Sequence, residues 1–168
     1  MQIKLIIGLG NEAKEFRRTY HNCGFIFVDF LRAFAPFEEY ISILPVVKTT
    51  GFMNQTGEVV RGYLREYRSE PSKTLIVHDD SDLELGRYKF SFDRGSSGHK
   101  GVEDIFDTTR ATDFWRLRIG IRKANNTLPA LDFVLDKILE TEFEILNAVF
   151  LKSATELLKS LKLSSSSN

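Results

Sequence analysis

Three histidines and a run of carboxylates are the residues of this sequence best suited to acid–base chemistry. His21, His78 and His99 are the only histidines in the 168-residue chain. Each stands at the end of an expected strand or in a loop that leads into an expected helix. Carboxylates follow His78 directly, at Asp79, Asp80 and Asp82. In α/β folds such loops meet beyond the carboxyl ends of the strands, where ligands bind, so we expect these groups to share one site.

Two asparagines add further groups that a hydrolytic site needs. Asn11 follows the first expected strand, and Asn54 stands at the start of an expected helix. A histidine suits a general base because its pKa lies near neutrality, and a carboxylate on its other ring nitrogen fixes the tautomer. Amide groups can hold a carbonyl. The chain has no clear G-x-S-x-G nucleophile elbow, so water is the expected nucleophile.

Each of these groups also has a structural interpretation. Asn11 fits a turn, Asn54 fits a helix cap, and the acidic run fits a solvated turn. A metal site made by the histidines is disfavoured, because the sequence has no close ligand pair such as H-x-x-x-H. The residues alone leave the structural and the catalytic alternatives open.

The elements that must position these groups alternate between strands and helices. Apolar or alternating runs predict strands at 3–9, 42–48, 73–78, 87–92 and 115–121. Helical spacing predicts helices at 23–34, 54–67 and 100–108, and a long amphipathic helix over 139–161. This alternation predicts an α/β fold: a single domain over 1–163, with a twisted, mostly parallel mixed sheet flanked by helices on both faces. We expect residues 164–168 to form a disordered tail.

The composition narrows the class of protein. The net charge is zero, which argues against a uniformly basic nucleic-acid-binding surface but leaves room for a local basic patch. Cys23 is the only cysteine, so no intramolecular disulfide can form and a reducing compartment is favoured. The apolar run at the start is too short for a signal peptide or a membrane span. We therefore expect a cytoplasmic protein.

Short motifs follow one another in a fixed order along residues 1 to about 136. They are Gly8-Leu9-Gly10-Asn11, His21-Asn22-Cys23-Gly24-Phe25, Phe52-Met53-Asn54-Gln55-Thr56-Gly57, His78-Asp79-Asp80-Ser81-Asp82-Leu83, Gly98-His99-Lys100-Gly101 and Arg116-Leu117-Arg118-Ile119-Gly120-Ile121. Each is weak alone, but in series they are specific, and the chain resembles the bacterial-type peptidyl-tRNA hydrolase family. The resemblance implies hydrolysis of the ester that joins a nascent peptide to its tRNA.

The resemblance also implies roles for the matching residues. His21 would be the base that activates water, and Asp79 would orient and polarise it. The groups expected to bind substrate are Asn11, Asn54, Phe52, His99 and Lys100. The clamp on the tRNA phosphate would be Arg118, assisted by Lys89 and Arg87. No metal or cofactor is implied, and we expect a monomer that acts on peptidyl-tRNA and has no membrane partner.

Several positions depart from the family pattern. Glu12-Ala13 stands in place of Pro-Gly, Asp93-Arg94-Gly95-Ser96-Ser97 in place of a glycine-rich run, and Lys123-Ala124-Asn125 in place of His-Pro-Gly. Ser91 occupies the position of one clamp lysine, and Lys100 that of an asparagine. If Lys100 points into the cleft, its ammonium lowers the pKa of His21 by like-charge repulsion. If it points away, its long stem carries the charge to solvent.

Two other functions fit parts of the sequence. Residues 8–13 match the relaxed dinucleotide-binding pattern G-x-G-x-x-G/A, and Asp29 has the spacing of its acidic residue. However, Asp29 lies inside an expected aromatic helix rather than at the end of a second strand. The alternative that stays open is a non-catalytic RNA-binding protein on the same fold, which the altered loops allow.

Overall fold

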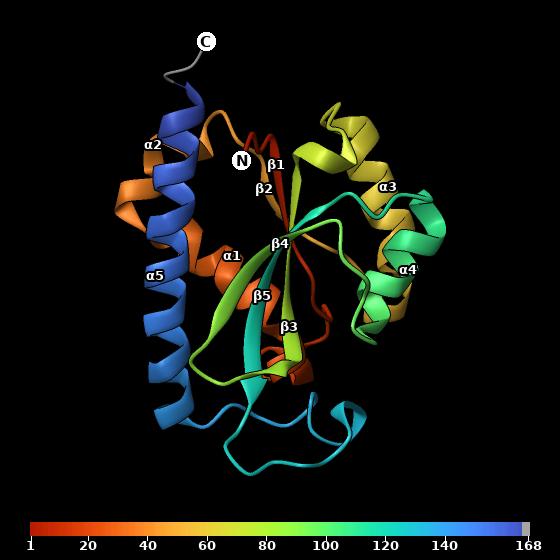
Figure 1. Cartoon of the computed structure of the whole chain (residues 1–168), viewed down its shortest axis with the longest axis vertical. Coiled ribbons are helices and arrows are strands. Elements are labelled where there is room, and N and C mark those ends of the chain that lie inside the picture. Colours follow the sequence, from red (N-terminus) through yellow and green to blue (C-terminus); the bar gives the residue numbers. More distant parts are fainter. Residues whose placement is uncertain (166–168) are drawn as a thin grey trace.

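Five strands form one sheet in the order β2-β1-β3-β5-β4 (Figure 1). The computed structural model describes residues 1–165. The strands are β1 Leu5–Gly8, β2 Val46–Lys48, β3 Thr74–Glu84, β4 Tyr88–Phe92 and β5 Trp115–Arg122. All neighbours are parallel except β4, which runs antiparallel to β5 at the edge of the sheet. The predicted mostly parallel mixed sheet is therefore confirmed.

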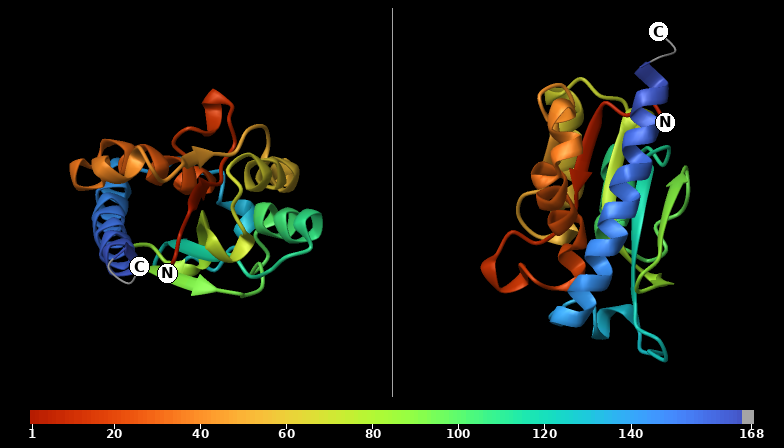
Figure 2. Two further views of the ribbon diagram at one scale, coloured as in Figure 1. Left: turned by 90° about the horizontal axis from the view of Figure 1, so that it is seen from above. Right: turned by 90° about the vertical axis from the view of Figure 1, so that its left-hand side faces the viewer.

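Helices cover both faces of this sheet, as the alternation of elements predicted. They are α1 Cys23–Ala33, α2 Glu38–Ile41, α3 Thr56–Glu66, α4 Lys100–Thr109 and α5 Glu140–Ser165. Helices α1 and α5 lie on one face, and α3 and α4 lie on the other (Figure 2). Phe27 and Phe150 belong to the core on the first face, and Val60 and Val102 to the core on the second. Both cores are apolar and exclude water from the two faces of the sheet.

Strand β3 is longer than the sequence predicted. The expected strand ended at His78, but the observed one continues to Glu84 because it goes on pairing with β5. Asp79 lies opposite Ile119 and Asp80 opposite Gly120 in this register. The acidic run, interpreted from the sequence as a loop or solvated turn, is therefore largely part of a strand, and its side chains alternate between the faces of the sheet.

Two other boundaries differ from the prediction. The strand expected over 42–48 is confined to β2, because residues 38–41 form the short helix α2 and the chain turns before it pairs with β1. Helix α5 extends to Ser165, so Ser164 and Ser165 are helical although both were expected in a disordered tail. Residues 166–168 of that expected tail lie outside the described residues. Among residues 1–165, no helix is long and apolar enough to cross a membrane.

Candidate active site

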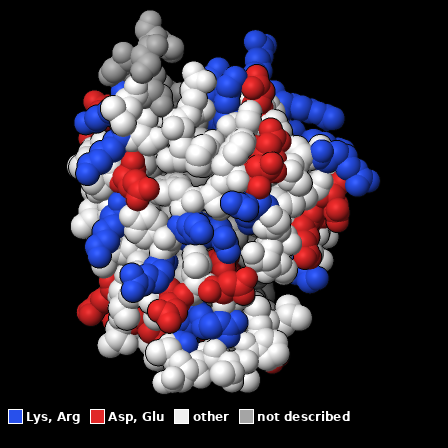
Figure 3. Space-filling view, viewed as in Figure 1, with Lys and Arg blue, Asp and Glu red and all other residues white. Residues whose placement is uncertain are grey.

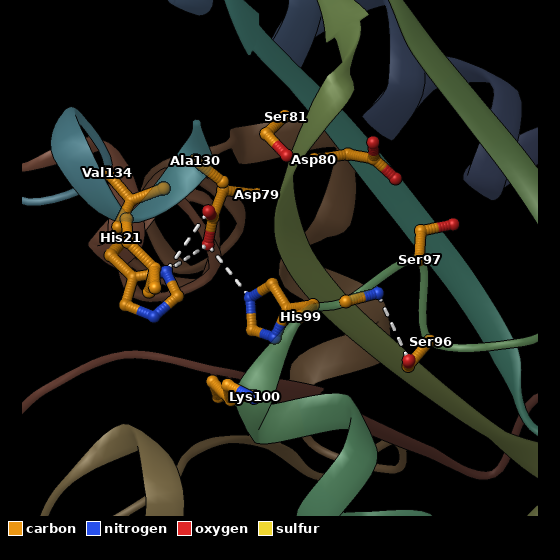
Figure 4. Close-up of a pocket in the computed structure, with 12 residues that line it drawn as sticks. His21, Asp79, Asp80, Ser81, Ser96, Ser97, His99, Lys100, Ala130 and Val134 are labelled. Atoms are coloured by element: carbon orange, nitrogen blue, oxygen red, sulfur yellow. Dashed lines mark hydrogen bonds and ion pairs between the residues drawn. The ribbon is translucent and has the colours of Figure 1, made fainter. Parts of the chain in front are cut away.

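His21 and Asp79 form a close pair, although 58 residues separate them along the chain. Nδ1 of His21 lies 3.0 Å from Oδ1 and 3.1 Å from Oδ2 of Asp79 (Figure 4). His21 lies on a single turn of 3-10 helix before α1, and Asp79 lies on β3 with 1% of its surface exposed. The predicted contact between these two side chains is therefore present.

The chain reaches this arrangement by packing the start of α1 directly on the sheet. A Cβ atom on Gly24 would lie 2.3 Å from the carbonyl oxygen of Val77 and 2.5 Å from that of Leu9, so only glycine fits there. Asn22 fixes the same segment, because its side chain accepts the N–H of Asn11 at 2.8 Å and donates to the Asn11 carbonyl at 2.9 Å. Asn22 precedes α1 but makes no side-chain hydrogen bond to it, so its side chain connects the helix start to β1 rather than capping the helix.

The hydrogen bonds define the protonation of the pair. Burial alone would raise the pKa of Asp79, but His21 and His99 lower it well below its usual range, so Asp79 is ionised. An ionised carboxylate can only accept hydrogen bonds, so Nδ1 of His21 carries a proton, and in the neutral ring the lone pair is on Nε2. Burial by itself would lower the pKa of His21, but the charge and the hydrogen bond of Asp79 outweigh it and raise that pKa. His21 is thus built to accept a proton at Nε2.

His99 contacts Asp79 from the other side. Its Nε2 lies 3.0 Å from Oδ1 of Asp79, and its Nδ1 accepts the N–H of Val102 at 3.3 Å, capping α4. Both ring nitrogens are therefore occupied by protein groups. From the sequence His99 was expected to bind substrate; the structure places it in the lining of the pocket beside His21, with its ring nitrogens in contact with Asp79 and Val102.

His78 is the third imidazole, and it is fully buried. Nδ1 of His78 donates to the carbonyl oxygen of Asp79 at 2.5 Å, and its ring packs edge-on against His99 with centroids 4.7 Å apart. Burial lowers the pKa of His78 well below its usual value, so the ring is neutral. With no access to solvent, His78 has a structural rather than a catalytic environment.

The group His21, Asp79 and His99 also has the composition of a metal site. One ligand atom of each lies within 4.8 Å of the others. A histidine that binds a metal through Nε2 carries its proton on Nδ1. For His99 that proton would face the N–H of Val102, which now donates to the same atom. The hydrogen-bond pattern therefore fits a carboxylate held by two N–H donors better than a metal centre.

A pocket opens beside the His21–Asp79 pair, and its two sides differ in character. One side is apolar and is formed by Ala130, Leu131 and Val134. The other side is polar and is formed by the loop and helix start that carry Ser96, Ser97, Gly98, His99 and Lys100. Figure 4 shows Val134 and Ala130 next to His21, with Ser96 and Ser97 across the pocket. No motif in the sequence pointed to the apolar side, which belongs to the loop after β5, where the family pattern is also altered.

Asn11, Phe52 and Asn54 lie outside the lining of this pocket. The side-chain oxygen of Asn11 accepts the N–H of Met53 at 2.9 Å, which joins the end of β1 to the turn that carries Asn54. Asn11 itself lines a neighbouring hollow, next to Asn22. Phe52 is 56% exposed, and Asn54 is also exposed. With its oxygen committed to Met53, Asn11 has only its amide nitrogen left to offer a carbonyl.

Lys100 lies at the rim of the pocket and turns away from His21. Its ammonium is 3.3 Å from a carboxylate oxygen of Glu103, one turn along α4, and its side chain is 61% exposed. Burial, opposed by the charge and the hydrogen bond of Asp79, sets the pKa of His21. Of the two orientations that the sequence left open, the structure has the one directed to solvent.

A cationic groove adjoins the polar side of the pocket, on the sheet face covered by α3 and α4. Lys89 and Arg118 lie directly opposite each other on β4 and β5 and both line it. Nε of Arg118 pairs with Asp80 at 2.5 Å, so this predicted clamp residue is already held by a carboxylate. Arg87 precedes β4 and is not part of the lining. The structure thus brings together two of the three predicted clamp residues.

Figure 3 shows basic and acidic side chains interspersed over the face it displays, in keeping with the zero net charge.

Two arginines, one lining this groove and one buried under the loop beside it, were not singled out as site residues from the sequence. Arg94 lines the groove beside Lys89 and Arg118. Arg116 is 1% exposed and holds the loop above it by donating to the carbonyl oxygens of Arg94 and Gly95 at 3.0 and 2.8 Å. Nε and Nη1 of Arg116 are buried without a partner, and burial lowers its pKa to about 10. The groove therefore holds more positive charge than Asp80 compensates.

Comparison with known proteins agrees with this geometry. A sequence profile of the family described as peptidyl-tRNA hydrolase matches residues 5–167. The peptidyl-tRNA hydrolase of Mycoplasma capricolum is 36% identical over 162 residues, covering 88% of this chain and 87% of that protein. The peptidyl-tRNA hydrolase of Aquifex aeolicus is 34% identical over an alignment of 178 residues, which covers 98% of this chain and 93% of that protein. The crystal structure of the peptidyl-tRNA hydrolase from Acinetobacter baumannii superposes with a TM-score of 0.82 at 27% identity, covering 98% of this chain and 90% of that one. The chain belongs to the peptidyl-tRNA hydrolase family.

Proposed function

We propose that this protein hydrolyses the ester between a nascent peptide and tRNA, with His21 as the base and water as the nucleophile. The observation that carries the proposal is the His21–Asp79 pair, in which Nδ1 is hydrogen-bonded to a buried carboxylate and Nε2 keeps its lone pair. A base oriented in this way can take a proton from water as the oxygen attacks a carbonyl.

The proposed reaction transfers one proton from water to Nε2 of His21 and then from Nε2 to the leaving group. Nε2 of His21 removes a proton from water while the water oxygen bonds to the ester carbonyl carbon. Asp79 stabilises the imidazolium that forms, since its ionised carboxylate already faces Nδ1. When the tetrahedral intermediate breaks down, the ribose oxygen leaves and takes the proton back from Nε2. The products are a peptide with a free carboxyl group and tRNA with a free ribose hydroxyl.

The surrounding residues would hold the substrate on either side of this step. The amide nitrogen of Asn11 and the side chain of Asn54 are available to donate to the peptide or its carbonyl, while Phe52 offers an exposed aromatic face. Lys89, Arg94 and Arg118 line a groove suited to RNA phosphates, because phosphate contacts supply most of the affinity for nucleic acid. Arg87 lies outside this groove and would contribute only through its charge.

We also propose that the protein acts as a monomer in the cytoplasm, on peptidyl-tRNA and without a membrane partner. Every residue of the His21–Asp79–His99 group comes from one chain, so the site needs no second copy. The proposed substrate is made by ribosomes, which supports the cytoplasm as the place of action.

The experiment that tests the function is incubation with an N-acetylated aminoacyl-tRNA, followed by measurement of free tRNA. We expect release by the wild-type protein and a large loss of release by His21→Ala. A protein that binds the substrate but releases no tRNA above the buffer rate, even at high protein concentration, would instead be the non-catalytic RNA-binding protein.

A further inference from the structure

The apolar side of the pocket exposes a large hydrophobic side chain next to the proposed catalytic base. Leu131 is 73% exposed, and it lines the same pocket as His21 and Asp79. Val134, which is 7% exposed, and Ala130 continue this apolar surface. Covering a solvent-exposed leucine at a binding site with an apolar group is favourable, because it removes apolar surface from water.

The apolar side is fixed against the His21 segment. The N–H of His21 donates to the carbonyl oxygen of Val134 at 2.8 Å. Farther along, the N–H of Ile138 donates to the carbonyl oxygen of Arg18 at 2.8 Å. Both bonds connect the loop after β5 to the turn that carries the catalytic histidine. A surface fixed in this way keeps a constant distance from the reacting ester, as a specificity pocket requires.

The charged groups around the pocket indicate how the substrate is oriented in it. The cationic groove adjoins the polar side of the pocket, across from Leu131, and Ser97 lines both the groove and the pocket. Arg118 of the groove contacts the Ser97 hydroxyl at 3.4 Å. A phosphate chain bound in the groove therefore enters the pocket from its polar side. With the ester at His21, the opposite, apolar side is left for the side chain of the esterified amino acid (Figure 4).

We propose that Leu131, together with Ala130 and Val134, forms a subsite for the side chain of the amino acid that is esterified to the tRNA. This inference rests on the proposed function and adds a substrate preference to it: peptidyl-tRNAs whose last residue is large and apolar are cleaved with higher kcat/KM than those ending in glycine. Hydrophobic pockets discriminate by about 10- to 200-fold for each methylene-sized difference. Because Leu131 is largely open to solvent, the bound side chain is only partly removed from water, and we expect about tenfold in total between leucine and glycine, the effect of a single fully buried methylene.

The test compares two substrates that share one tRNA body and differ only in the acyl group, N-acetylleucine or N-acetylglycine. The measured quantity is the ratio of kcat/KM for the leucyl ester to that for the glycyl ester. We expect a ratio of about ten in the wild type and a ratio near one in Leu131→Ser. The matched control is Leu128→Ser in the same loop, because Leu128 is 52% exposed but does not line the pocket. That control should keep the wild-type ratio.

Two outcomes would overturn the subsite. A wild-type ratio near one would show that the enzyme does not read the acyl side chain. Equal losses on both esters in Leu131→Ser, with an unchanged ratio, would mean that Leu131 contacts a group common to all substrates, such as the terminal nucleoside. Failure of the underlying function looks different, since neither ester would then be cleaved by the wild-type protein.

Discussion

Nε2 of His99 and Nδ1 of His21 both lie 3.0 Å from the same oxygen, Oδ1 of Asp79. One carboxylate thus holds two imidazoles, and only that of His21 has a free nitrogen. The asymmetry comes from Val102, whose N–H occupies the second nitrogen of His99. Because of this difference, His21 can exchange a proton at its second nitrogen, whereas His99 only holds Asp79 in place.

His99→Asn should separate the two contacts of His99. Asparagine is a good N-cap, so α4 keeps its cap, but the shorter side chain cannot reach Asp79. Losing a hydrogen bond to a charged group costs about 1.5–3 kcal/mol, so we expect kcat to fall by about 10- to 100-fold with little change in KM. Steady-state kinetics on N-acetylated aminoacyl-tRNA measure this. A raised KM with unchanged kcat would restore the substrate-binding role predicted from the sequence.

His21→Ala should lower kcat by about 10²- to 10⁴-fold, because it removes the base but leaves the binding surfaces. Thermal unfolding should confirm that the variant is folded. Turnover equal to that of the wild type would exclude His21 as the base.

The pH profile of Asp79→Asn should separate the electrostatic effect of Asp79 from a purely structural one. Asp79 raises the pKa of His21, so the wild-type acidic limb should lie above about pH 6.5, the ordinary histidine value. Neutralising the carboxylate removes that effect, and burial then lowers the pKa of His21. We expect the acidic limb of kcat/KM to move to lower pH while the maximal rate falls. A reduced rate with an unmoved limb would contradict the assignment.

His78 makes a prediction about stability rather than rate. Its folded-state pKa is depressed, so its contribution to stability is present above the unfolded value of about 6.5 and is lost as the pH falls below it. The unfolded chain then binds one proton more than the folded chain, which gives a slope of about 1.4 kcal/mol per pH unit. Urea unfolding between about pH 4.5 and 6.5 measures the slope, below the range where the raised pKa of His21 acts and above that of the carboxylates.

The variant His78→Asn should flatten that slope. An asparagine amide can still donate to the carbonyl of Asp79, but it does not titrate. The difference in stability between the variant and the wild type at neutral pH measures the packing lost with the imidazole ring. The same slope in the variant and the wild type would show that another group takes up the proton.

The groove residues should act through the salt dependence of tRNA binding. Each phosphate contact contributes about 0.7–0.9 to the slope of log K against log salt, so Arg94→Ala should lower that slope by this amount. Lys152→Ala is the control, because Lys152 is an exposed residue of α5 outside the groove. An equal change in both variants would show that only the total charge matters.

Lys100→Asn should have little effect on turnover or on the pH profile. The ammonium of Lys100 is paired with Glu103 and directed to solvent, so its removal leaves the surroundings of His21 unchanged. An acidic limb that moves upward in this variant would show that Lys100 enters the cleft when substrate binds.

The sequence predicted the elements well because apolar periodicity reports burial directly. It failed where tertiary pairing extended an element. Nothing in the residues after His78 indicates that β3 continues, since its extension depends on β5, which lies more than thirty residues farther along. The His21–Asp79 contact came from the family resemblance, but the resemblance contains no information about where the second ring nitrogen of His99 points. Arg116 was missed as a site residue because burial of an arginine under a loop has no local signature.

The hydrogen bond from His21 to Val134 joins a turn near the start of the chain to a loop that precedes only its last helix, and this affects when the protein becomes active. A growing polypeptide folds from its N-terminus while it is still attached to the ribosome. Asp79 is fixed only after β5 has paired with β3, and His21 is held in place only after the loop that follows β5 has emerged. While it is being synthesised, the chain is itself the peptide of a peptidyl-tRNA. The late assembly of the site delays its activity until that synthesis is nearly complete.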